Sequence, residues 1–449
     1  MTGPTVVWLR DDLRLADNPA LTAAAARNEP VVLLYVLDDE SPEVRPLGAA
    51  SRWWLHHSLT ALAESVGGAL WLRRGAAFDV VQAVAADAGA GAVLWNRRYG
   101  AAREVDARLK TALRSAGVEV ESFQASLLFE PWTVTTGQGE PYKVFTPFWR
   151  ACLERNVREP LPVAEVEWVF PSSTSGNDHG SDDLASWQLL PTRPDWAGGL
   201  RETWTPGEAG AHARLEHFLA GPIDDYNRRD EPAVEATSML SPHLRFGEIS
   251  PFQVWQAAHG ASRNSAKFLS EVGWREFNAN ILFYSPDLAT RNYRAAFDAF
   301  PWDAPAPGDL EAWKTGRTGI PLVDAGMREL WHTGYMHNRV RMVVASFLIK
   351  NLLVDWRIGE QWFWDTLVDA DEASNPGNWQ WVAGSGADAA PYFRVFNPEL
   401  QRSKFDPHNE YVERWVPEYL MPDYPEPIVD LAQSRKDALA AYEAVKNPG

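Results

Sequence analysis

Sixteen consecutive residues, from Asp369 to Gly384, combine several side chains that could do chemistry. The run reads DADEASNPGNWQWVAG, with two aspartates, a Ser-Asn pair and two tryptophans. Helical residues two positions apart point about 200° apart, so Trp379 and Trp381 face nearly opposite directions. A helix that buries a single face repeats its bulky residues three or four positions apart instead. The spacing therefore predicts a site with a different neighbour on each side of this helix.

A second candidate lies at residues 237–242, which read TSMLSP ahead of a helix-forming sequence. Clustered hydroxyls and backbone amides at the start of a helix form a natural phosphate cradle, and the helix dipole adds to it. An ordinary N-cap is the commoner explanation when these residues are taken alone. The stretch therefore supports a phosphate-binding site only in combination with other ligand-binding residues.

Two further stretches place polar and aromatic side chains on one helix face. Glu271, Trp274 and Arg275 follow the spacing i, i+3 and i+4, so an acid, a flat ring and a guanidinium lie side by side. This set suits a polar aromatic ligand, and an interhelical salt bridge beside a packed indole explains it equally well. Asn338 and Met342 also share a face, where an amide next to a soft thioether suits a heteroaromatic ligand.

Basic residues near these stretches could contact phosphates. Arg339 lies on another face of its helix, and Arg394, Arg402 and Lys404 follow downstream. Together they form a local positive set that suits phosphate contacts. As isolated charges they would be ordinary solvated surface.

The composition limits the class of protein. A chain of 449 residues is long enough for two or three domains. Tryptophan outnumbers tyrosine, 22 to 12, which large helical interfaces explain in part. The remaining indoles could stack on bases, pack against a flat cofactor or carry electrons. The net charge of -18 argues against indiscriminate binding of nucleic acid and leaves room for a local basic groove.

The single cysteine and the N-terminal sequence indicate the cellular compartment of the protein. Cys152 alone excludes an internal disulfide, a Cys-rich zinc site and a Cys-ligated iron–sulfur cluster. The first residues, MTGPTVVWLRDDLRL, are charged by position 10 and contain no signal-peptide core. No apolar run is long enough to span a membrane. We expect a soluble cytoplasmic protein without a bound metal.

The first 125 residues alternate strand-like and helix-like segments. The expected strands are Thr5–Leu9, Val31–Leu37, Ala69–Arg73, Ala92–Asn96 and Val118–Phe123. The expected helices between them are Pro19–Arg27, Arg52–Val66, Phe78–Ala88 and Arg103–Ser115. Strands joined by crossover helices predict a Rossmann-like α/β domain with a parallel sheet. No GxGxxG or P-loop sequence follows the first strand, so no nucleotide-phosphate site is predicted there.

Residues 126–205 contain many prolines and a polar string, which predict a connector. Residues 206–449 show helical periodicity and predict a larger all-α domain. The expected helices there are Ala209–Ala220, Pro251–Gly260, Ala266–Phe283, Leu322–Thr333, His337–Leu353 and Gly359–Val368.

Taken together, these motifs resemble the DNA photolyase/cryptochrome family, and most closely its cyclobutane-pyrimidine-dimer photolyases. The N-terminal VVWLRDDLRLADNPAL resembles the opening strand of the family. The stretches TSMLSPHLRFGEISP, WREF, GIPLVDAGMRELWHTGYMHNRVRM and DADEASNPGNWQWVAGSGADAAPYFRVFNP resemble its flavin-domain signatures. WNRRY, TPFWRA and LLPTRPDW resemble the class III branch or close bacterial relatives. The resemblance covers nearly the whole chain.

The resemblance implies an antenna-type α/β domain and a helical domain that binds FAD. The implied activity is light-driven repair, in which reduced FAD excited by blue light passes an electron to a dimer flipped out of DNA, and the dimer splits into two pyrimidines. Asp369 is expected to pair with Arg341 beside the flavin, and Asn375 to face flavin N5. The other implied FAD contacts are Tyr226, Thr237, Ser238, Met239, Leu240, Ser241, Arg275, Asn338, Asp371 and Ser374.

The resemblance also assigns the substrate side. Residues expected to hold the dimer are Glu271, Trp274, Asn338, Met342 and Trp381. Residues expected to relay electrons to resting flavin are Trp302, Trp356 and Trp379. Expected DNA-phosphate contacts are Arg229, Arg339 and Arg394, and the expected partner is UV-damaged DNA.

Two other functions fit the family. A cryptochrome-type photoreceptor without repair is the first, and Asn375 with the complete dimer set disfavours it. A (6-4) photolyase is the second, and it is disfavoured because relatives of that class carry histidines where this chain has Asn338 and Met342. For a second, antenna chromophore, methenyltetrahydrofolate is preferred over an 8-hydroxy-deazaflavin or FMN. A monomer is expected.

Overall fold

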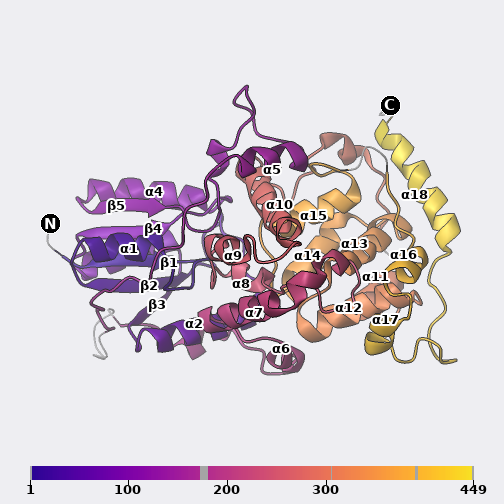
Figure 1. Cartoon of the computed structure of the whole chain (residues 1–449), viewed down its shortest axis with the longest axis horizontal. Helices are drawn as coiled ribbons and strands as arrows, with labels where there is room; N and C mark the ends of the chain where they lie inside the picture. Colours follow the sequence, from indigo (N-terminus) through magenta and orange to yellow (C-terminus); the bar gives the residue numbers. More distant parts are fainter. Residues whose placement is uncertain (1–2, 172–179, 305, 390–392, 447–449) are drawn as a thin grey trace.

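A computed structural model describes residues 3–171, 180–304, 306–389 and 393–446. It has a sheet at one end and a helical region at the other, and the two chain ends lie far apart (Figure 1). Within these described ranges, no helix is long and apolar enough to cross a membrane.

The sheet has five parallel strands in the order β3-β2-β1-β4-β5. They are β1 (Thr5–Leu9), β2 (Val31–Leu37), β3 (Leu70–Arg74), β4 (Ala92–Asn96) and β5 (Glu119–Phe123). Between them run α1 (Pro19–Ala26), α2 (Ala49–Ser65), α3 (Ala77–Asp87) and α4 (Arg103–Ser115). The strands and crossover helices were all predicted, and the strand bounds differ by one residue at most.

Both faces of the sheet are buried, which explains why β1 and β2 are uninterrupted apolar runs. Val7 and Leu9 point into the core beneath α1 and α2, whereas Val6 and Trp8 point into the core beneath α3 and α4. β1 pairs with both β2 and β4, so the strand order reverses there. Such a reversal leaves a crevice at the carboxyl ends of the strands, where ligands bind in open α/β sheets.

Residues 126–171 and 180–205 pack against both halves of the molecule. Their helical turns are η1 (Pro131–Thr133), α5 (Phe145–Leu153), η2 (Leu184–Trp187) and α6 (Gly198–Thr203). Trp187, Leu200 and Trp204 are buried in the core of the α/β half. α5 was not predicted, and it packs against α10 of the helical half. The predicted domain limits at 125 and 205 stay predictions.

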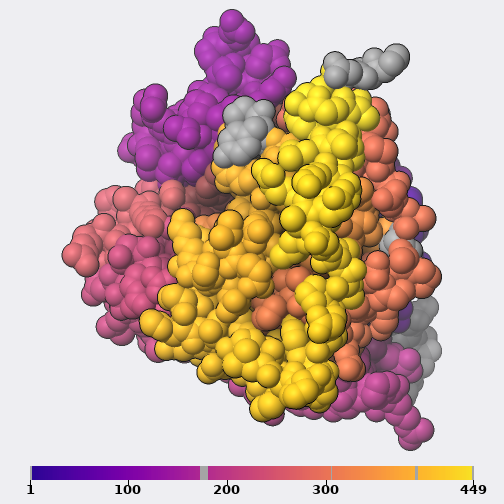
Figure 2. Space-filling model, turned by 90° about the vertical axis from the view of Figure 1, so that its right-hand side faces the viewer, coloured from indigo at the N-terminus to yellow at the C-terminus, as the bar shows by residue number. Residues whose placement is uncertain are grey.

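The rest of the chain is helical, as predicted. Its helices are α7 (Glu208–Ala220), η3 (Pro222–Arg228), α8 (Ser241–Arg245), α9 (Pro251–Ala258), α10 (Ser265–Tyr284), η4 (Ala295–Ala299), α11 (Pro307–Thr315), α12 (Pro321–Thr333), α13 (Asn338–Ser346), η5 (Phe347–Asn351), α14 (Trp356–Thr366), α15 (Ser374–Ala383), α16 (Pro398–Phe405), α17 (Glu410–Trp415) and α18 (Leu431–Lys446). The predicted single helix His337–Leu353 is α13 followed by the π-helical η5. α18 lies at the end farthest from the sheet, and Figure 2 shows the C-terminal residues covering much of that face.

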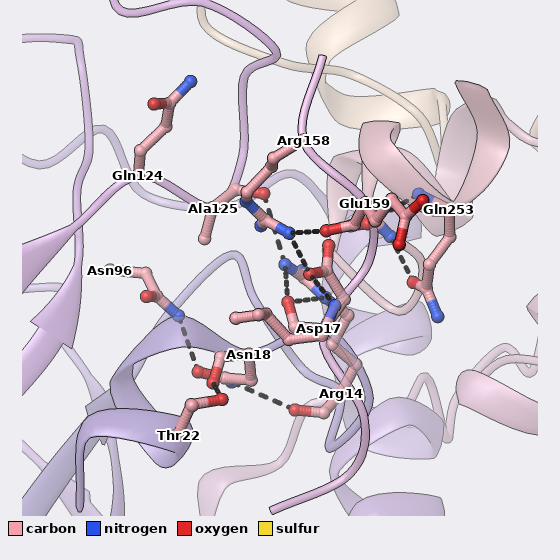
Figure 3. Close-up of polar contacts among 12 residues, drawn as sticks. Arg14, Asp17, Asn18, Thr22, Asn96, Gln124, Ala125, Arg158, Glu159 and Gln253 are labelled. Carbon is pink, nitrogen blue, oxygen red and sulfur yellow. Dashed lines mark hydrogen bonds and ion pairs between the residues drawn. The ribbon is translucent and has the colours of Figure 1, made fainter. Parts of the chain in front are cut away.

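A buried arginine ties the two halves together (Figure 3). Arg14 is fully buried, and its guanidinium donates to the carbonyl oxygens of Asp17 at 2.9 Å, Ala125 at 3.2 Å and Gly247 at 2.9 Å. The carboxylate of Asp17 accepts from Arg158 and from the amide of Leu161. The α/β half and the helical half therefore meet at Arg14, and the connector joins them through the carboxylate of Asp17.

Candidate active site

A cavity of about 480 Å³ opens among α8, α10, α13 and α15. Most of the predicted site residues line it, although they come from segments far apart in the sequence. The predicted residues in its wall are Tyr226, Arg229, Ser238, Leu240, Ser241, Glu271, Trp274, Arg275, Asn338, Arg339, Arg341, Met342, Asp369, Asp371, Ser374, Asn375, Trp379 and Trp381. Five predicted residues lie outside the wall: Thr237, Met239, Trp302, Trp356 and Arg394.

An ion pair joins α13 to the loop before α15 at the wall of the cavity. Arg341 donates to both carboxylate oxygens of Asp369, at 3.0 and 2.8 Å, and its Nε donates to the carbonyl of Met336. Ser241 Oγ donates to the same carboxylate at 2.7 Å. Asp369 is almost buried and needs such partners. This pairing fixes the first residue of the 369–384 run against both α8 and α13.

The segment before α8 contributes polar groups to one end of the cavity. Ser238 and Ser241 line the wall, and Ser238 Oγ accepts from the amide of Leu240. Met239 between them has φ of 50° and packs away from the cavity against the core of the α/β half. Thr237 likewise lies off the wall. The left-handed turn at Met239 thus directs this side chain to the core, while Ser238, Leu240 and Ser241 line the cavity.

Asn375 presents a fixed amide to the cavity. The residue is nearly buried, and its Nδ2 donates to the carbonyl oxygen of Glu360 at 3.1 Å and to the carboxylate of Glu360 at 2.8 Å. Two acceptors around one nitrogen identify it as the NH₂ end of the amide. The amide oxygen is therefore the atom that Asn375 turns away from Glu360.

Ion pairs hold the arginines at the cavity mouth. Arg229 lies 2.8 Å from Glu271, and Arg339 lies 2.9 Å from Asp230. Burial raises the pKa of Glu271, against the lowering effect of Arg229. Both arginines were predicted as DNA-phosphate contacts, and in this structure each already has an acidic partner across the mouth.

Two predicted indoles, Trp274 and Trp381, line the cavity from different helices. The ring of Trp274 stacks on Phe145 of α5, with centroids 4.0 Å apart and planes at 10°. Trp381 is half-buried and donates from Nε1 to the carbonyl of Asp388 at 3.1 Å. One face of Trp274 is covered by Phe145, so its other face is the one available to a ligand.

The other indole of the 369–384 run has different neighbours. Trp379 is buried, with its ring 4.9 Å from that of Phe363 and closely packed over Gly359 of α14. Trp356, at the start of α14, is fully buried and donates to Asn292. Trp302 is half-buried, and its ring lies at a tilt 4.3 Å from that of Phe300. Trp379 and Trp356 are thus both buried, and Trp302 is more exposed than either.

Several polar wall residues were not predicted. Arg245 donates to the carbonyl of Ala370 and to the carboxylate of Asp11. Asp230, Asn278 and Asn378 also line the cavity. The signal for Arg245 was its place in SPHLRFGE, directly after the predicted phosphate cradle. Asp230 carries no spacing signal, because its partner Arg339 lies on a separate element.

The wall chemistry fits FAD. A pyrophosphate needs hydroxyl and cationic donors, and the wall offers the Ser238 hydroxyl and the Arg275 guanidinium. A flavin ring needs an apolar slot with polar partners at its edge. Phe363 and Leu367 are apolar wall residues, and Asp369, Asp371 and Asn375 are the polar ones. In the described part of the chain, no cluster of His, Cys, Asp or Glu could hold a metal ion.

A second cavity, of about 190 Å³, lies in the crevice at the carboxyl ends of the strands. Its wall combines Tyr35, Asp38 and Asn96 of the α/β half with Arg275 and Glu372 of the helical half. Burial raises the pKa of Glu372. Arg245, Arg275 and Asp371 line both cavities, so the two share part of a wall.

Comparison with known proteins identifies the family. The family model described as the FAD binding domain of DNA photolyase matches residues 268–422, and the model described as DNA photolyase matches residues 5–166. The chain is 48% identical to the deoxyribodipyrimidine photo-lyase of Agrobacterium fabrum, over 99% of this chain and 98% of the relative. The chain belongs to the DNA photolyase family. The predicted family is confirmed.

Solved structures confirm the predicted fold class of this photolyase. A class III photolyase from Agrobacterium tumefaciens superposes with a TM-score of 0.93 at 47% identity, covering 99% of this chain and 98% of that one. An archaeal photolyase from Sulfolobus tokodaii, solved with two FAD molecules, superposes with a TM-score of 0.82 at 30% identity, covering 98% and 99%. An FAD-binding helical domain behind a parallel sheet is therefore the architecture of this chain.

Proposed function

We propose that this photolyase repairs UV-damaged DNA by splitting cyclobutane pyrimidine dimers in light. The observation that carries the proposal is a single cavity whose wall combines the FAD-type residues with Glu271, Trp274, Asn338, Met342 and Trp381. The 48% identity to a deoxyribodipyrimidine photo-lyase over nearly the full length of both chains supports the same activity. The similarity to a class III photolyase favours repair over a cryptochrome role.

The chain's own residues bind and orient both molecules. Arg341 and Asp369 fix the wall at the proposed flavin edge, and Ser238 and Arg275 hold the proposed pyrophosphate. When bound and reduced, FAD supplies the photoexcited electron donor. We assign the thymine pair to the mouth, where Trp274 and Trp381 stack on it and Glu271 accepts from base N–H groups.

Two residues set the proposed substrate class. Asn338 is exposed at the N-terminus of α13, and Met342 lies one turn later on the same face. Neither can act as a proton donor to the lesion in the way that a histidine can. We therefore propose the cyclobutane dimer, and not the (6-4) product, as substrate.

The test uses purified protein with chemically reduced FAD and oligonucleotides that contain one lesion type each. Illumination should restore thymine absorbance at the cyclobutane dimer and leave the (6-4) oligonucleotide unchanged. Glu271→Gln should lower the yield by weakening dimer binding, whereas Glu311→Gln, on an exposed helix surface, should not. No recovery with flavin-loaded, reduced wild type would overturn the proposal.

For the second cavity we propose an antenna chromophore, with methenyltetrahydrofolate preferred from the resemblance. Its place at the strand ends and its polar wall support a flat, polar ligand. A second flavin is the alternative, because the Sulfolobus tokodaii photolyase was solved with two FAD molecules. An absorption spectrum of purified protein, before and after denaturation, identifies the chromophore. Glu372→Gln should lower its occupancy, and Glu121→Gln, an exposed position outside the cavity wall, should not.

We also propose that the protein acts as a cytoplasmic monomer. Size-exclusion chromatography with light scattering tests the oligomeric state, and a dimer would contradict it.

A further inference from the structure

Arg45 of the α/β half reaches into the helical half and ends on a single buried carboxylate. Its guanidinium donates to both oxygens of Glu360, at 2.7 and 2.9 Å. The Glu360 side chain is 1% exposed, and that of Arg45 is 25% exposed. The guanidinium also lies over the ring of Trp364, 3.9 Å from its centroid. Residues 315 apart in the sequence are thus joined by a fork-shaped, charge-assisted contact.

The same carboxylate holds the amide of Asn375. Glu360 Oε1 accepts from Arg45 Nη1 at 2.7 Å and from Asn375 Nδ2 at 2.8 Å. The carbonyl oxygen of Glu360 accepts from the same nitrogen. An ionised Glu360 can only accept hydrogen bonds, so it requires the NH₂ end of Asn375 to face it and the amide oxygen to face the other way.

Removing the guanidinium would leave the buried carboxylate of Glu360 without a counter-charge. An uncompensated buried charge is strongly unfavourable and is avoided by taking up a proton or by moving. A protonated Glu360 has a donor of its own, which the oxygen of Asn375 could accept. The NH₂ end of Asn375 would then be held only by the carbonyl oxygen of Glu360, so turning the amide over would cost one hydrogen bond instead of two. The direction of the Asn375 amide therefore depends on Arg45.

We propose that Arg45 is a positioning residue that keeps the oxygen of Asn375 directed at the flavin. This inference rests on the proposed function in one respect, the assignment of Asn375 to flavin N5. An amide oxygen there accepts from the N5–H of reduced flavin and opposes the lone pair of oxidised flavin. The Asn375 oxygen thereby stabilises the reduced flavin relative to the oxidised flavin, and repair requires the reduced flavin. Because Arg45 also lines the second cavity, an occupant of that cavity would lie against the same positioning residue.

The experiment measures the midpoint potential of FAD bound to the full-length protein, without DNA. Arg45→Met keeps an unbranched side chain and removes the charge, together with the guanidinium that lies over Trp364. Its potential should fall below that of wild type, and Arg45→Lys, which keeps the charge without the fork, should fall by less. Asp365→Asn is the matched control, since Asp365 accepts from Ala49 across the same interface and does not touch Glu360. Its potential should equal that of wild type.

A double-mutant cycle tests whether the effect passes through the amide. In an Asn375→Leu background, Arg45→Met should produce no further shift in potential. An equal shift in both backgrounds, or an unchanged potential in Arg45→Met, would overturn the proposal. Where Arg45→Met does not retain FAD, the same cycle is run with Arg45→Lys, and an unchanged potential there also overturns it. A protein that splits no dimers would still give these potentials, so the repair proposal and the positioning proposal fail separately.

Discussion

Trp379 and Trp381 are two residues apart on α15 and have different neighbours. Trp379 packs on Phe363 and over Gly359, on the side of the proposed relay. Trp381 hydrogen-bonds the carbonyl of Asp388 and forms part of the cavity mouth. Side chains this close in sequence can therefore be changed separately, and their proposed roles can be tested separately.

Trp379→Phe should block photoreduction of oxidised flavin and spare repair by chemically reduced enzyme. A phenyl ring preserves most of the packing and is much harder to oxidise than an indole. Flavin absorbance under illumination measures the first effect, and recovery of thymine absorbance measures the second. Loss of both activities in a protein that still binds FAD would contradict the separation of roles.

Glu276, on α10, makes stability depend on pH. The residue is 2% exposed, and burial raises its pKa to about 7 from 4.5 in spite of the nearby Arg275. A raised carboxyl pKa means that the folded state favours the proton. The contribution to stability is therefore complete below pH 4.5 and is lost as the pH rises through 7.

The side chain at position 276 is neutral at every pH in Glu276→Gln. This variant therefore does not lose that contribution to stability as the pH rises. Its free energy of unfolding, relative to wild type, should rise by up to about 3 kcal/mol between pH 5 and 8. Chemical denaturation at several pH values measures the difference. Glu311→Gln, on α11, serves as the exposed control and should show no such trend. A parallel pH dependence of wild type and Glu276→Gln would contradict the assignment.

At the scale of elements, α14 and α15 meet through a glycine. A Cβ at Gly359 would overlap the ring of Trp379 and the side chain of Leu348. The two helices can approach this closely only because that position has no side chain. The approach sets how Trp379 lies relative to α14, whose first residue is Trp356.

Gly359→Ala should therefore destabilise the protein by about 1–3 kcal/mol through overpacking. It should also slow flavin photoreduction, because Trp379 must shift. Thermal unfolding measures the first effect, and flavin absorbance under light the second. Gly308→Ala is the control, since a Cβ there meets nothing within 4 Å. An unchanged melting temperature in Gly359→Ala would show that the helices adjust without strain.

Elements with a clear period could be predicted from the sequence, and contacts between elements could not. The strand β2 is apolar throughout and β1 is apolar after Thr5, and the limits of both were predicted to the residue. The sequence FTPFWRACL of α5 lies among prolines and was assigned to the connector, yet its Phe145 supports Trp274. Apolar spacing does not separate an α-helix from a π-helical turn, which explains the missed break after Ser346.

In the candidate site too, residues on one element could be placed together from the sequence, and contacts between elements could not. Helix spacing placed Glu271, Trp274 and Arg275 together, because they share one element. The pairing of Glu271 with Arg229 spans 42 residues and two elements, and nothing in the local sequence encodes it. The fork from Arg45 to Glu360 spans 315 residues. Such pairs depend on how the two halves of the molecule are docked.

At the scale of the whole molecule, Arg14 is one of the buried contacts that hold the two halves together. Removing its guanidinium would leave the carbonyl oxygens of Asp17, Ala125 and Gly247 without that donor. Each buried acceptor left unsatisfied costs about 1–3 kcal/mol. The net charge of the chain contributes no comparable free energy to the docking of the two halves, because it acts over long distances and is screened by salt.

Arg14→Met should accordingly lower the free energy of unfolding by at least about 3 kcal/mol. It should also split one unfolding transition into two, because the halves lose their shared cation. Calorimetry measures both effects. Arg228→Met is the control, since Arg228 forms an exposed ion pair with Glu231 and its loss should change neither. A single transition with a small shift would show that the halves are held together elsewhere.

The position of the last Arg14 partner has a consequence for synthesis on the ribosome. The strands of the sheet are complete at Phe123, whereas Gly247 lies 233 residues beyond Arg14. Domains generally fold from the N-terminus as the chain is made. During translation, the newly formed sheet must therefore keep this cation hydrated until Gly247 has left the exit tunnel. The α/β half of the nascent chain is thus open to water at the surface where the helical half will dock.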